Sequence, residues 1–574
     1  MTAPVLQVRT LGVEVKAMSG ASSGTSIRAG TGEARGSTEA TVRLLDRVSF
    51  DVMPGSSVGV VGASGAGKST LGLALMRLLP PAMRFTDGSS VRLGDQDLAA
   101  LDAEALRQLR GRRIAMVFQE PITALNPAMT IGDQLAESVL VHGLATAPEA
   151  RERAVAMLER VGIAGGAAGA RRYPHELSGG MRQRLLLAMP LMLDPLLLIA
   201  DEPTTALDPV RQAQMLDLLD DMRAASGTAM LLISHDLEII GERCERVIVL
   251  DEGRVVEEGA TAQVLSQPRS VAAERLGAAR LPLAVPTRST RVPALAGAAP
   301  DSDRAVTATR TAPLLEVQDL AVTYPERRRG FRSTAAVAAV ESVSLTLSPG
   351  EVLGVVGESG CGKTSLALGI LRLIPSRSAS LRFDGADLAR LEGEPLRRAR
   401  RHLQFMPQDA GASLSPHLTC ESLVSEGLVV HGICDEREAR ERARALLDEL
   451  ELLPQTAQSR PQELSTGQRQ RVALARALAT EPRVLICDEP VSSVDPPTRA
   501  RLLDLLSSLR ASRGLAMLFI SHDLPAVALI ADRVMVLQRG RVVETGTTEA
   551  VILRPAQAYT REFLAAVPTG APRR

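Results

Sequence analysis

Gly-Ala-Ser-Gly-Ala-Gly-Lys-Ser at residues 62–69 and Gly-Glu-Ser-Gly-Cys-Gly-Lys-Thr at residues 357–364 decide the fold of this chain. Both octets fit G-x-x-x-x-G-K-[ST], the P-loop whose backbone N–H groups cradle phosphates. A short apolar run precedes each octet, at 58–61 and 352–356, and a stretch rich in leucine and alanine follows. A buried strand that leads through the loop into a helix is the setting this motif requires. The chain is therefore predicted to bind a nucleoside triphosphate at two places.

The composition is that of an ordinary globular protein with room for two or more domains. Of the 574 residues 45% are hydrophobic, and 66 basic residues balance 66 acidic ones. A zero net charge leaves no electrostatic footprint for nucleic acid, so no nucleic-acid partner is expected. Prolines and an aspartate break the nearest long apolar run, at 185–200, so we expect no membrane span, and the start of the chain resembles no targeting segment. Five scattered cysteines, none in a C-x-x-C pair, are expected to be reduced thiols.

The P-loops are not the only segments that occur twice. Lys363 follows Lys68 by 295 residues, and three further segments return in the same order, each 287 residues later. They are Leu-Ser-Gly-Gly-Met-Arg-Gln-Arg (177–184), which returns with two changes at 464–471, Ile-Ala-Asp-Glu-Pro (199–203), which returns with one change at 486–490, and Ile-Ser-His-Asp-Leu (233–237), which returns at 520–524. A near-constant offset indicates that a whole domain is duplicated. We expect a first domain at 1–275 with a flexible insert at about 18–41, a linker at 276–313 and a second domain at 314–574.

Strand-like apolar runs alternate with helical periods in each copy, which favours an α/β core. The segments at about 120–175 and 409–462 are long and rich in helical pattern, so each is expected to form a helical subdomain inserted into the core. The predicted fold class is α/β, with two P-loop NTPase domains that each carry such an insertion.

The P-loops indicate which residues meet the nucleotide. Lys68 and Lys363 are expected to reach the β- and γ-phosphates, and the hydroxyls of Ser69 and Thr364 to bind Mg²⁺. The full predicted set of contacts around the two loops is Gly62, Ala63, Ser64, Gly65, Ala66, Gly67, Lys68, Ser69 and Thr70 in the first copy, and Gly357, Glu358, Ser359, Gly360, Cys361, Gly362, Lys363, Thr364 and Ser365 in the second.

A pair of carboxylates ends a fully apolar run in each copy, Asp201-Glu202 in the first and Asp488-Glu489 in the second. Such a run suits a central parallel strand, and ligands of open α/β sheets bind where those strands end. Taken alone, this pair is most often a solvated strand edge, but its position after a P-loop favours a role at the nucleotide. Asp201 and Asp488 are expected in the Mg²⁺ shell, and Glu202 and Glu489 are placed to act as general bases on the attacking water.

His235 and His522 follow the next apolar run of their copies. A lone histidine after a strand is usually structural. Its return in the same pentapeptide favours a contact with the γ-phosphate.

The segment at 177–184 resembles the signature of ATP-binding-cassette (ABC) ATPases. A P-loop, a glutamine loop, this signature, an Asp-Glu pair and a histidine occur in this order in that superfamily, and the resemblance covers nearly the whole chain. It implies that two cassettes stack head to tail, and that each ATP lies between one P-loop and the other signature. It also implies that Gln119 and Gln408 act in catalysis and bind Mg²⁺. Site one then joins the first P-loop, Gln119, Asp201, Glu202 and His235 to Ser465, Thr466 and Gly467. Site two joins the second P-loop, Gln408, Asp488, Glu489 and His522 to Ser178, Gly179 and Gly180.

Three stretches resemble importers of oligopeptides, dipeptides or nickel within that superfamily. They are Gln119–Thr130, Tyr173–Arg184 and the tail Arg554–Pro568 with its Tyr-Thr-Arg. In that group the two cassettes are often separate subunits, whereas here they are fused. The tail of the first copy, from Gln267, lacks the Tyr-Thr pair.

The two copies depart from the family pattern in different ways. Thr466 stands where the second signature should have glycine. The aromatic residue that stacks on adenine in the family fits Tyr324, but the first copy has no aromatic residue between Leu6 and Arg43. Pro190 is expected inside the helix after the first signature, where an interior proline costs about 3 kcal/mol unless the helix kinks. We expect two unequal sites, with site two the stronger ATPase.

The resemblance implies an ATP-hydrolysing subunit that drives an importer for peptides or a related small solute. ATP and Mg²⁺ are the expected cofactors. The expected partners are two membrane permease subunits and, indirectly, an external substrate-binding protein, with the chain held peripherally at the cytoplasmic face of the inner membrane. Two alternatives remain open: a tandem-cassette factor that acts on ribosomes or DNA, and an exporter ATPase.

Overall fold

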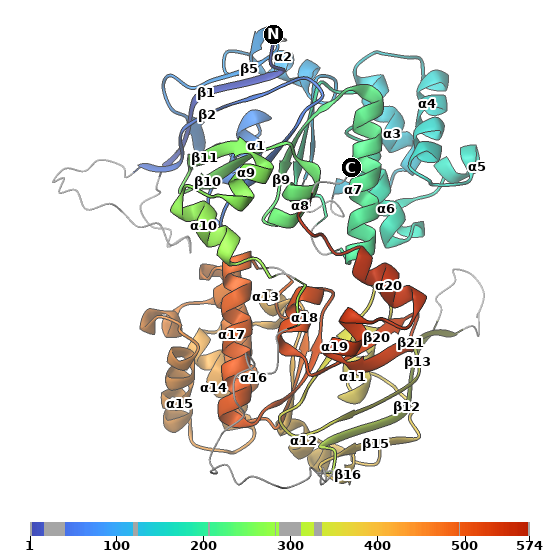
Figure 1. The fold of residues 1–574 in the computed structure, drawn as a ribbon, viewed down its shortest axis with the longest axis vertical. Coiled ribbons are helices and arrows are strands. Elements are labelled where there is room, and N and C mark those ends of the chain that lie inside the picture. Colours follow the sequence, from blue (N-terminus) through green and yellow to red (C-terminus); the bar gives the residue numbers. More distant parts are fainter. Residues whose placement is uncertain are drawn as a thin grey trace, which may run out of the picture.

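The computed structural model describes residues 3–16, 41–118, 124–204, 207–281, 283–285, 312–325, 336–492 and 494–571. We call the described residues of 3–281 the first copy and those of 312–571 the second copy. The predicted insert at 18–41 lies almost wholly outside the described residues, as does most of the predicted linker at 276–313. Each copy contains a six-stranded sheet, an antiparallel sheet and a group of helices (Figure 1).

The six-stranded sheet carries the P-loop in each copy. Its strand order is β11-β10-β3-β9-β8-β7 in the first copy and β21-β20-β14-β19-β18-β17 in the second, which is the same topology. All neighbours are parallel except the hairpin at the β11 or β21 edge. The strands are β3 (Ser57–Val61), β7 (Ile114–Val117), β8 (Leu197–Asp201), β9 (Ala229–Ile233), β10 (Arg246–Asp251), β11 (Arg254–Ala260), β14 (Val352–Val356), β17 (Leu403–Met406), β18 (Val484–Asp488), β19 (Ala516–Ile520), β20 (Arg533–Gln538) and β21 (Arg541–Thr547).

The antiparallel sheet covers the P-loop helix and closes one half of the core. Apolar side chains of its strands form one buried cluster with those of the six-stranded sheet in each copy. Its strands are β1 (Leu6–Lys16), β2 (Thr41–Val52), β4 (Met83–Phe85), β5 (Ser90–Leu93) and β6 (Gln96–Asp97) in the first copy, and β12 (Leu315–Pro325), β13 (Ala336–Leu347), β15 (Ser380–Phe383) and β16 (Ala386–Asp387) in the second.

Helices of the cores flank the sheets. They are α1 (Lys68–Leu75), α2 (Ala103–Leu109), α7 (Pro209–Ser226), α8 (Leu237–Arg243), α9 (Thr261–Ser266) and α10 (Val271–Ala278), and in the second copy α11 (Lys363–Ile370), α12 (Gly393–Arg401), α17 (Pro496–Arg513), α18 (Leu524–Ile530), α19 (Thr548–Leu553) and α20 (Ala558–Ala565). The long helices α7 and α17 begin identically, with an aspartate N-cap followed by proline, and end at a glycine with positive φ.

The predicted helical insertions are present in both copies. The first contains α3 (Ile131–Val141), α4 (Ala147–Arg160), α5 (Gly166–Ala170), a 3₁₀ turn at Pro174–Glu176 and α6 (Gly179–Ala188). The second contains α13 (Ala410–Ser413), α14 (Cys420–Val430), α15 (Glu436–Glu449), 3₁₀ turns at Pro454–Gln458 and Pro461–Glu463, and α16 (Thr466–Leu478). The predicted α/β fold class with inserted helices is therefore confirmed.

The expectation that Pro190 lies inside a helix is wrong. Helix α6 ends at Ala188, whereas its counterpart α16 continues to Leu478 past Ala477, which stands in place of Pro190. Proline disfavours helical backbone at the residue before it and has no N–H to donate. The first signature helix is therefore shorter than the second.

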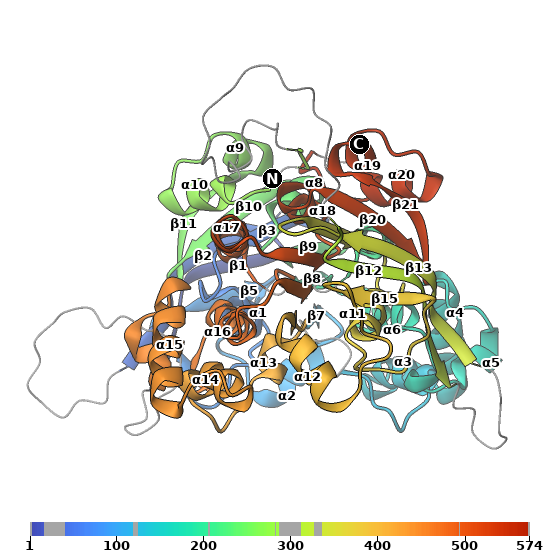
Figure 2. The same cartoon turned by 90° about the horizontal axis from the view of Figure 1, so that it is seen from below.

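The copies lie one above the other with opposite orientation (Figures 1 and 2). Each six-stranded core faces the helical insertion of the other copy in both views. Helix α10 packs on α17 and α20 packs on α7, so the ends of both copies cross the interface. Leu281, the last residue of the first copy, and Leu283 pack against the apolar core of the second copy. No helix within the described ranges has the length and apolarity needed to cross a bilayer.

Candidate nucleotide-binding sites

The two P-loops have nearly the same geometry. Each runs from the end of β3 or β14 into α1 or α11, through a glycine N-cap with left-handed backbone, at φ 99° for Gly67 and 108° for Gly362. A Cβ at Gly362 would lie 2.2 Å from the carbonyl oxygen of Ala339, so only glycine fits there. The loop is therefore fixed by packing beneath it, and its N–H groups sit at the N-terminus of a helix, where anions bind.

The P-loop lysines are folded back onto their own loops. Lys68 Nζ donates to the carbonyl oxygens of Gly62 (2.8 Å) and Ala63 (2.9 Å). Lys363 Nζ donates in the same way to Gly357 (2.7 Å) and Glu358 (3.0 Å). Burial lowers the pKa of Lys68, although nearby carboxylates oppose this shift. Both ammonium groups are therefore held beside the place where phosphate is expected.

The aspartates at the ends of β8 and β18 lie next to the P-loop hydroxyls. Thr364 Oγ1 donates to Asp488 Oδ2 at 2.7 Å, and Ser69 hydrogen-bonds Asp201. The Oδ1 atoms of both aspartates are buried and have no partner among the described residues. Burial raises the pKa of Asp201 to about 6, and it raises that of Asp488 as well. Unpaired buried carboxylate oxygens beside a hydroxyl are the donor set that Mg²⁺ takes together with phosphate, so these residues fit the ion.

The glutamates that follow these aspartates pair with the predicted histidines. His235 Nδ1 lies 3.1 Å from Glu202 Oε1, and His522 Nδ1 contacts the Glu489 carboxylate. Burial alone would lower the pKa of each histidine, but the bond to glutamate and its charge outweigh burial, so both pKa values are raised. Both glutamates have positive φ, 47° and 52°, and their N–H groups donate to the end of the neighbouring strand. This strained backbone turns the carboxylates out of the sheet, toward the site.

The signature residues begin helices α6 and α16. Ser178 and Ser465 are the N-caps, and each hydroxyl accepts from a backbone N–H three residues on, at 3.3 Å. A Cβ at Gly179 would meet nothing within 4 Å. Thr466, its counterpart, accepts a bond from Arg469 on its hydroxyl. Both helix starts are open to an anion, while their pairing with the opposite P-loop stays a prediction.

Two aspartates that the sequence reasoning missed act on the P-loop of the other copy, one through a hydrogen bond and one through its charge. Asp208, the N-cap of α7, accepts a bond from Ser359 N at 2.9 Å across the interface. Asp495, the N-cap of α17, lies near enough to Lys68 for its charge to raise the pKa of that lysine. Leu-Asp-Pro in the first copy returns as Val-Asp-Pro 287 residues later, and this repeat was the available signal.

The remaining predicted residues differ in how far the structure describes them. The hydroxyl of Tyr324 lies 3.2 Å from Ser365 Oγ, and its ring is 41% exposed beside the P-loop helix. The register of β1 and β12 places Val15 at the equivalent position of the first copy. Gln408 is exposed just after β17, and Gln119 lies outside the described residues. Of the two equivalent positions in β1 and β12, only that of the second copy carries an aromatic side chain.

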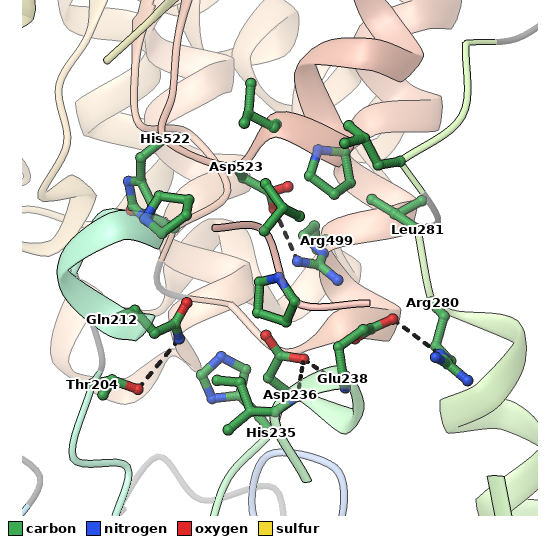
Figure 3. A pocket seen from close by; sticks show the side chains of 18 of the residues that line it. Thr204, Gln212, His235, Asp236, Glu238, Arg280, Leu281, Arg499, His522 and Asp523 are labelled. Atoms are coloured by element: carbon green, nitrogen blue, oxygen red, sulfur yellow. Dashed lines mark hydrogen bonds and ion pairs between the residues drawn. The ribbon is translucent and has the colours of Figure 1, made fainter. Parts of the chain in front are cut away.

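A cavity of about 640 Å³ lies between the copies, behind both histidines (Figure 3). Arg499, near the start of α17, donates to Asp523 Oδ2 at 2.9 Å. Its counterpart Gln212 donates instead to Thr204 Oγ1 at 3.3 Å. The aspartates that follow the two histidines thus have different surroundings, because Asp236 faces Glu238, which binds Arg280.

Comparisons with known proteins place both copies in one family. The profile of the family described as "ABC transporter" matches residues 45–205 and 340–492. A glutathione import ATP-binding protein of Pectobacterium atrosepticum is 39% identical over 94% of this chain and 89% of its own length. A peptidoglycan transport ATP-binding protein of Agrobacterium fabrum is 41% identical over 92% of this chain and 93% of its own. A solved dimeric bacterial ABC transporter cassette is 28% identical, covers 41% of this chain and 98% of its own, and has a TM-score of 0.38.

The resemblance read from the signature is therefore confirmed over both copies. A family profile covering more than half of the chain matches it, and relatives align along nearly its full length. The chain belongs to the ABC transporter family, as an ATP-binding and ATP-hydrolysing protein with two cassettes.

Proposed function

We propose that this chain is the ATPase subunit of an importer for peptides or a related small solute. The observation that carries the proposal is the joint presence of two cassettes and relatives, aligned along nearly the full chain, that are named for glutathione import and peptidoglycan transport. Glutathione is a tripeptide and peptidoglycan contains peptides, so peptide-like solutes are the common class. The Tyr-Thr-Arg tail of the second copy supports the same subfamily.

The catalytic roles follow from the geometry of the two sites. Lys68 and Lys363 would turn from their own loop carbonyls to the phosphates, and Mg²⁺ would be held by Asp201 or Asp488 with the adjoining hydroxyl. Glu202 and Glu489 would position water and accept its proton, with the histidine bonded to each carboxylate fixing its direction. Positioning and charge stabilisation supply most of the rate in such phosphoryl transfers.

The two sites share one interface, which supports coupled hydrolysis. Asp208 of the first copy bonds the second P-loop, and the charge of Asp495 in the second copy acts on Lys68 of the first. Binding of ATP at one site therefore alters contacts made by the copy that completes the second site. The coupling free energy between two binding sites is reciprocal, so ATP bound at either site changes the affinity of the other site for ATP by the same factor.

Membrane permease subunits are the proposed partners, two in number, with an external substrate-binding protein acting through them. The chain would lie peripherally on the inner face of the membrane. Docking is proposed through the helical insertions, near Ala124 and Ala412, which are both exposed. These insertions lie at opposite ends of the interface in Figure 1, so the pair can contact two permeases at once.

Cross-linking in host membranes tests the docking. Ala124→Cys and Ala412→Cys, each treated with a short thiol cross-linker, should capture a membrane permease, and the parent chain with its own five cysteines is the control. Capture only from positions in the linker or the tail would overturn the docking site.

Transport is tested in vesicles that contain the captured complex. ATP should drive uptake of labelled glutathione or short peptides, and the Lys68→Ala/Lys363→Ala variant should abolish it. Recovery of the chain with ribosomes and without permeases, or ATP-driven movement of solute in the outward direction, would overturn the importer proposal.

A further inference from the structure

The tail helices α10 and α20 are anchored by the same device in both copies. The Glu544 carboxylate accepts bonds from the N–H groups of Ala556 and Gln557, at 2.8 and 3.1 Å, just before α20. Glu257 accepts in the same way before α10, with Ser270 N at 2.8 Å. A carboxylate at a helix start satisfies N–H groups that have no partner within the helix. Both tails are therefore held firmly at equivalent places.

Among the described residues, only the second tail bonds its own P-loop. The Tyr559 hydroxyl accepts a bond from Glu358 N at 3.4 Å and also bonds the Glu358 side chain. Burial, followed by the charge of Glu358, raises the pKa of the Tyr559 hydroxyl, so it stays protonated and can donate. Its ring stacks on Phe563, with centroids 6.1 Å apart, and Phe563 is almost completely buried. Tyr559 therefore connects the tail to the P-loop in a fixed position, and we call this contact the strut.

The first copy lacks both halves of this contact. In the repeat, Ala272 stands in place of Tyr559 and Ala63 in place of Glu358. An alanine side chain cannot form a hydrogen bond, so α10 cannot hold the first P-loop in this manner. The duplicated chain thus contains an internal control for the contact.

Glu358 connects Tyr559 to the P-loop lysine, Lys363, because it bonds both residues. Its carbonyl oxygen accepts bonds from Lys363 Nζ at 3.0 Å and from Cys361 N at 3.2 Å. The next N–H, that of Ser359, is held by Asp208 of the first copy. Helix α20 also packs on α7, which begins directly after Asp208. The tail and the first copy therefore hold two successive residues of the second P-loop.

We propose that Tyr559 is a positioning residue of the second ATP site, which holds the second P-loop in its binding conformation and gives this site the higher nucleotide affinity. A loop that is already ordered loses less conformational entropy when ligand binds, and this difference adds to affinity. The inference rests on the proposal that both P-loops bind ATP. The first loop, without a strut, carries that ordering cost in full.

Tyr559→Phe in the full chain is the test, because it removes the hydroxyl and keeps the ring on Phe563. Lys68→Ala isolates site two, and Lys363→Ala isolates site one as the matched control. In the Lys68→Ala background, Tyr559→Phe should weaken binding of Mg²⁺ and a non-hydrolysable ATP analogue by about 3- to 10-fold, the scale of one hydrogen bond. KM should rise by the same factor while kcat stays within about twofold.

In the Lys363→Ala background the same substitution should leave affinity at site one unchanged. Equal affinities with Tyr and Phe at site two would overturn the inference, as would an equal loss at both sites, which marks a general loss of structure. Thermal unfolding of all four variants identifies that second case. Failure of the parent chain to bind the analogue at either site would instead defeat the proposed function, so the two failures are distinguishable.

Discussion

The two copies contain the same candidate catalytic groups and differ in what surrounds them. The aspartate, glutamate and histidine lie at or just after the same strand ends in both copies, and the lysine begins the same helix, with matching bonds. The copies differ in residues outside this set of candidate catalytic groups. The second copy has Tyr324, Thr466 and Arg499 at the positions where the first has Val15, Gly179 and Gln212. The groups at the sheet edge are the same in both copies, as are the aspartate N-caps Asp208 and Asp495, whereas the residue beside the P-loop helix and the tail residue that meets the P-loop differ. The copies thus share one chemistry and are expected to differ in affinity and coupling.

These differences point mostly in one direction. The second P-loop has Tyr324 and the strut from Tyr559 beside it, and the signature predicted to face it has two glycines. The first P-loop has Val15 and no such strut among the described residues, and the signature predicted to face it has Thr466. The shorter helix α6 behind the signature of site two is the opposing feature, but it ends ten residues beyond the N-cap Ser178. The expected result is that site two carries more of the ATPase activity.

The P-loop lysines provide the largest test of this comparison. Lys68→Ala and Lys363→Ala each remove the cation beside the phosphates of one site, and a lost stabilising contact of this kind costs about 100- to 1,000-fold at that site. Steady-state phosphate release should therefore fall in both single variants, more in Lys363→Ala, and be nearly abolished in the double variant. A double variant with full activity would contradict an ATPase at these loops.

The general-base glutamates sharpen the comparison further. Glu202→Gln and Glu489→Gln keep the shape of the side chain and the bond to histidine but remove the base, which contributes about 100- to 10,000-fold to such a step. Because site two is expected to turn over faster, Glu489→Gln should reduce steady-state ATPase of the assembled transporter more than Glu202→Gln. The asymmetry is refuted if Glu202→Gln costs as much as Glu489→Gln.

The sequence predicts the parts of the site that depend on local order along the chain. Each P-loop octet lies between a strand and a helix, the Asp-Glu pairs end buried strands, and the serines of both signatures cap helices. These features follow from spacing and residue type within a few tens of residues. The duplication strengthens these predictions, because each pattern occurs twice in the chain.

Contacts between distant segments could not be predicted in the same way. Asp208 meets Ser359 across 151 residues, and Tyr559 meets Glu358 across 201. No periodicity encodes which surfaces of the two copies meet. Pro190 shows a local limit as well: the proline was noticed, but whether a helix bends or stops at it depends on the packing around it, and here the helix stops.

Thr466 gives a prediction of intermediate size. A Cβ at Gly179 would have open space around it, so threonine costs the fold little at this position and its effect should fall on the facing nucleotide. Thr466→Gly in the Lys363→Ala background should raise ATPase at site one about 2- to 5-fold, if one contact near 1 kcal/mol is regained. The exchange Gly179→Thr in the Lys68→Ala background is the matched control and should lower activity at site two. Unchanged rates in both would remove Thr466 from the asymmetry.

The smallest predicted effect concerns the aspartates that follow the two histidines. Burial, followed by the bond to Glu238, raises the pKa of Asp236 to about 7, while the charges of His235 and Arg499 oppose the shift. Although burial opposes it, bonds from Asp236 and Arg280 lower the pKa of Glu238, so the shared proton stays on Asp236. Asp523 has instead the guanidinium of Arg499 at 2.9 Å.

The stability of the chain should therefore fall as Asp236 loses its proton. The unfolded chain releases this proton near pH 3.8 and the folded chain near 7, so the folded state binds it more tightly, and raising the pH through this window removes stability. Asp236→Asn keeps a helix-capping oxygen and imitates the protonated form. Between pH 5 and pH 8 the wild-type Tm should drop relative to the variant by a few degrees, since about 1 kcal/mol corresponds to about 2–4 °C in a domain of this size. Asp523→Asn, which breaks the bond to Arg499, should instead destabilise the chain at neutral pH. Parallel Tm curves for wild type and Asp236→Asn across this range would show that the two aspartates do not differ as the geometry predicts.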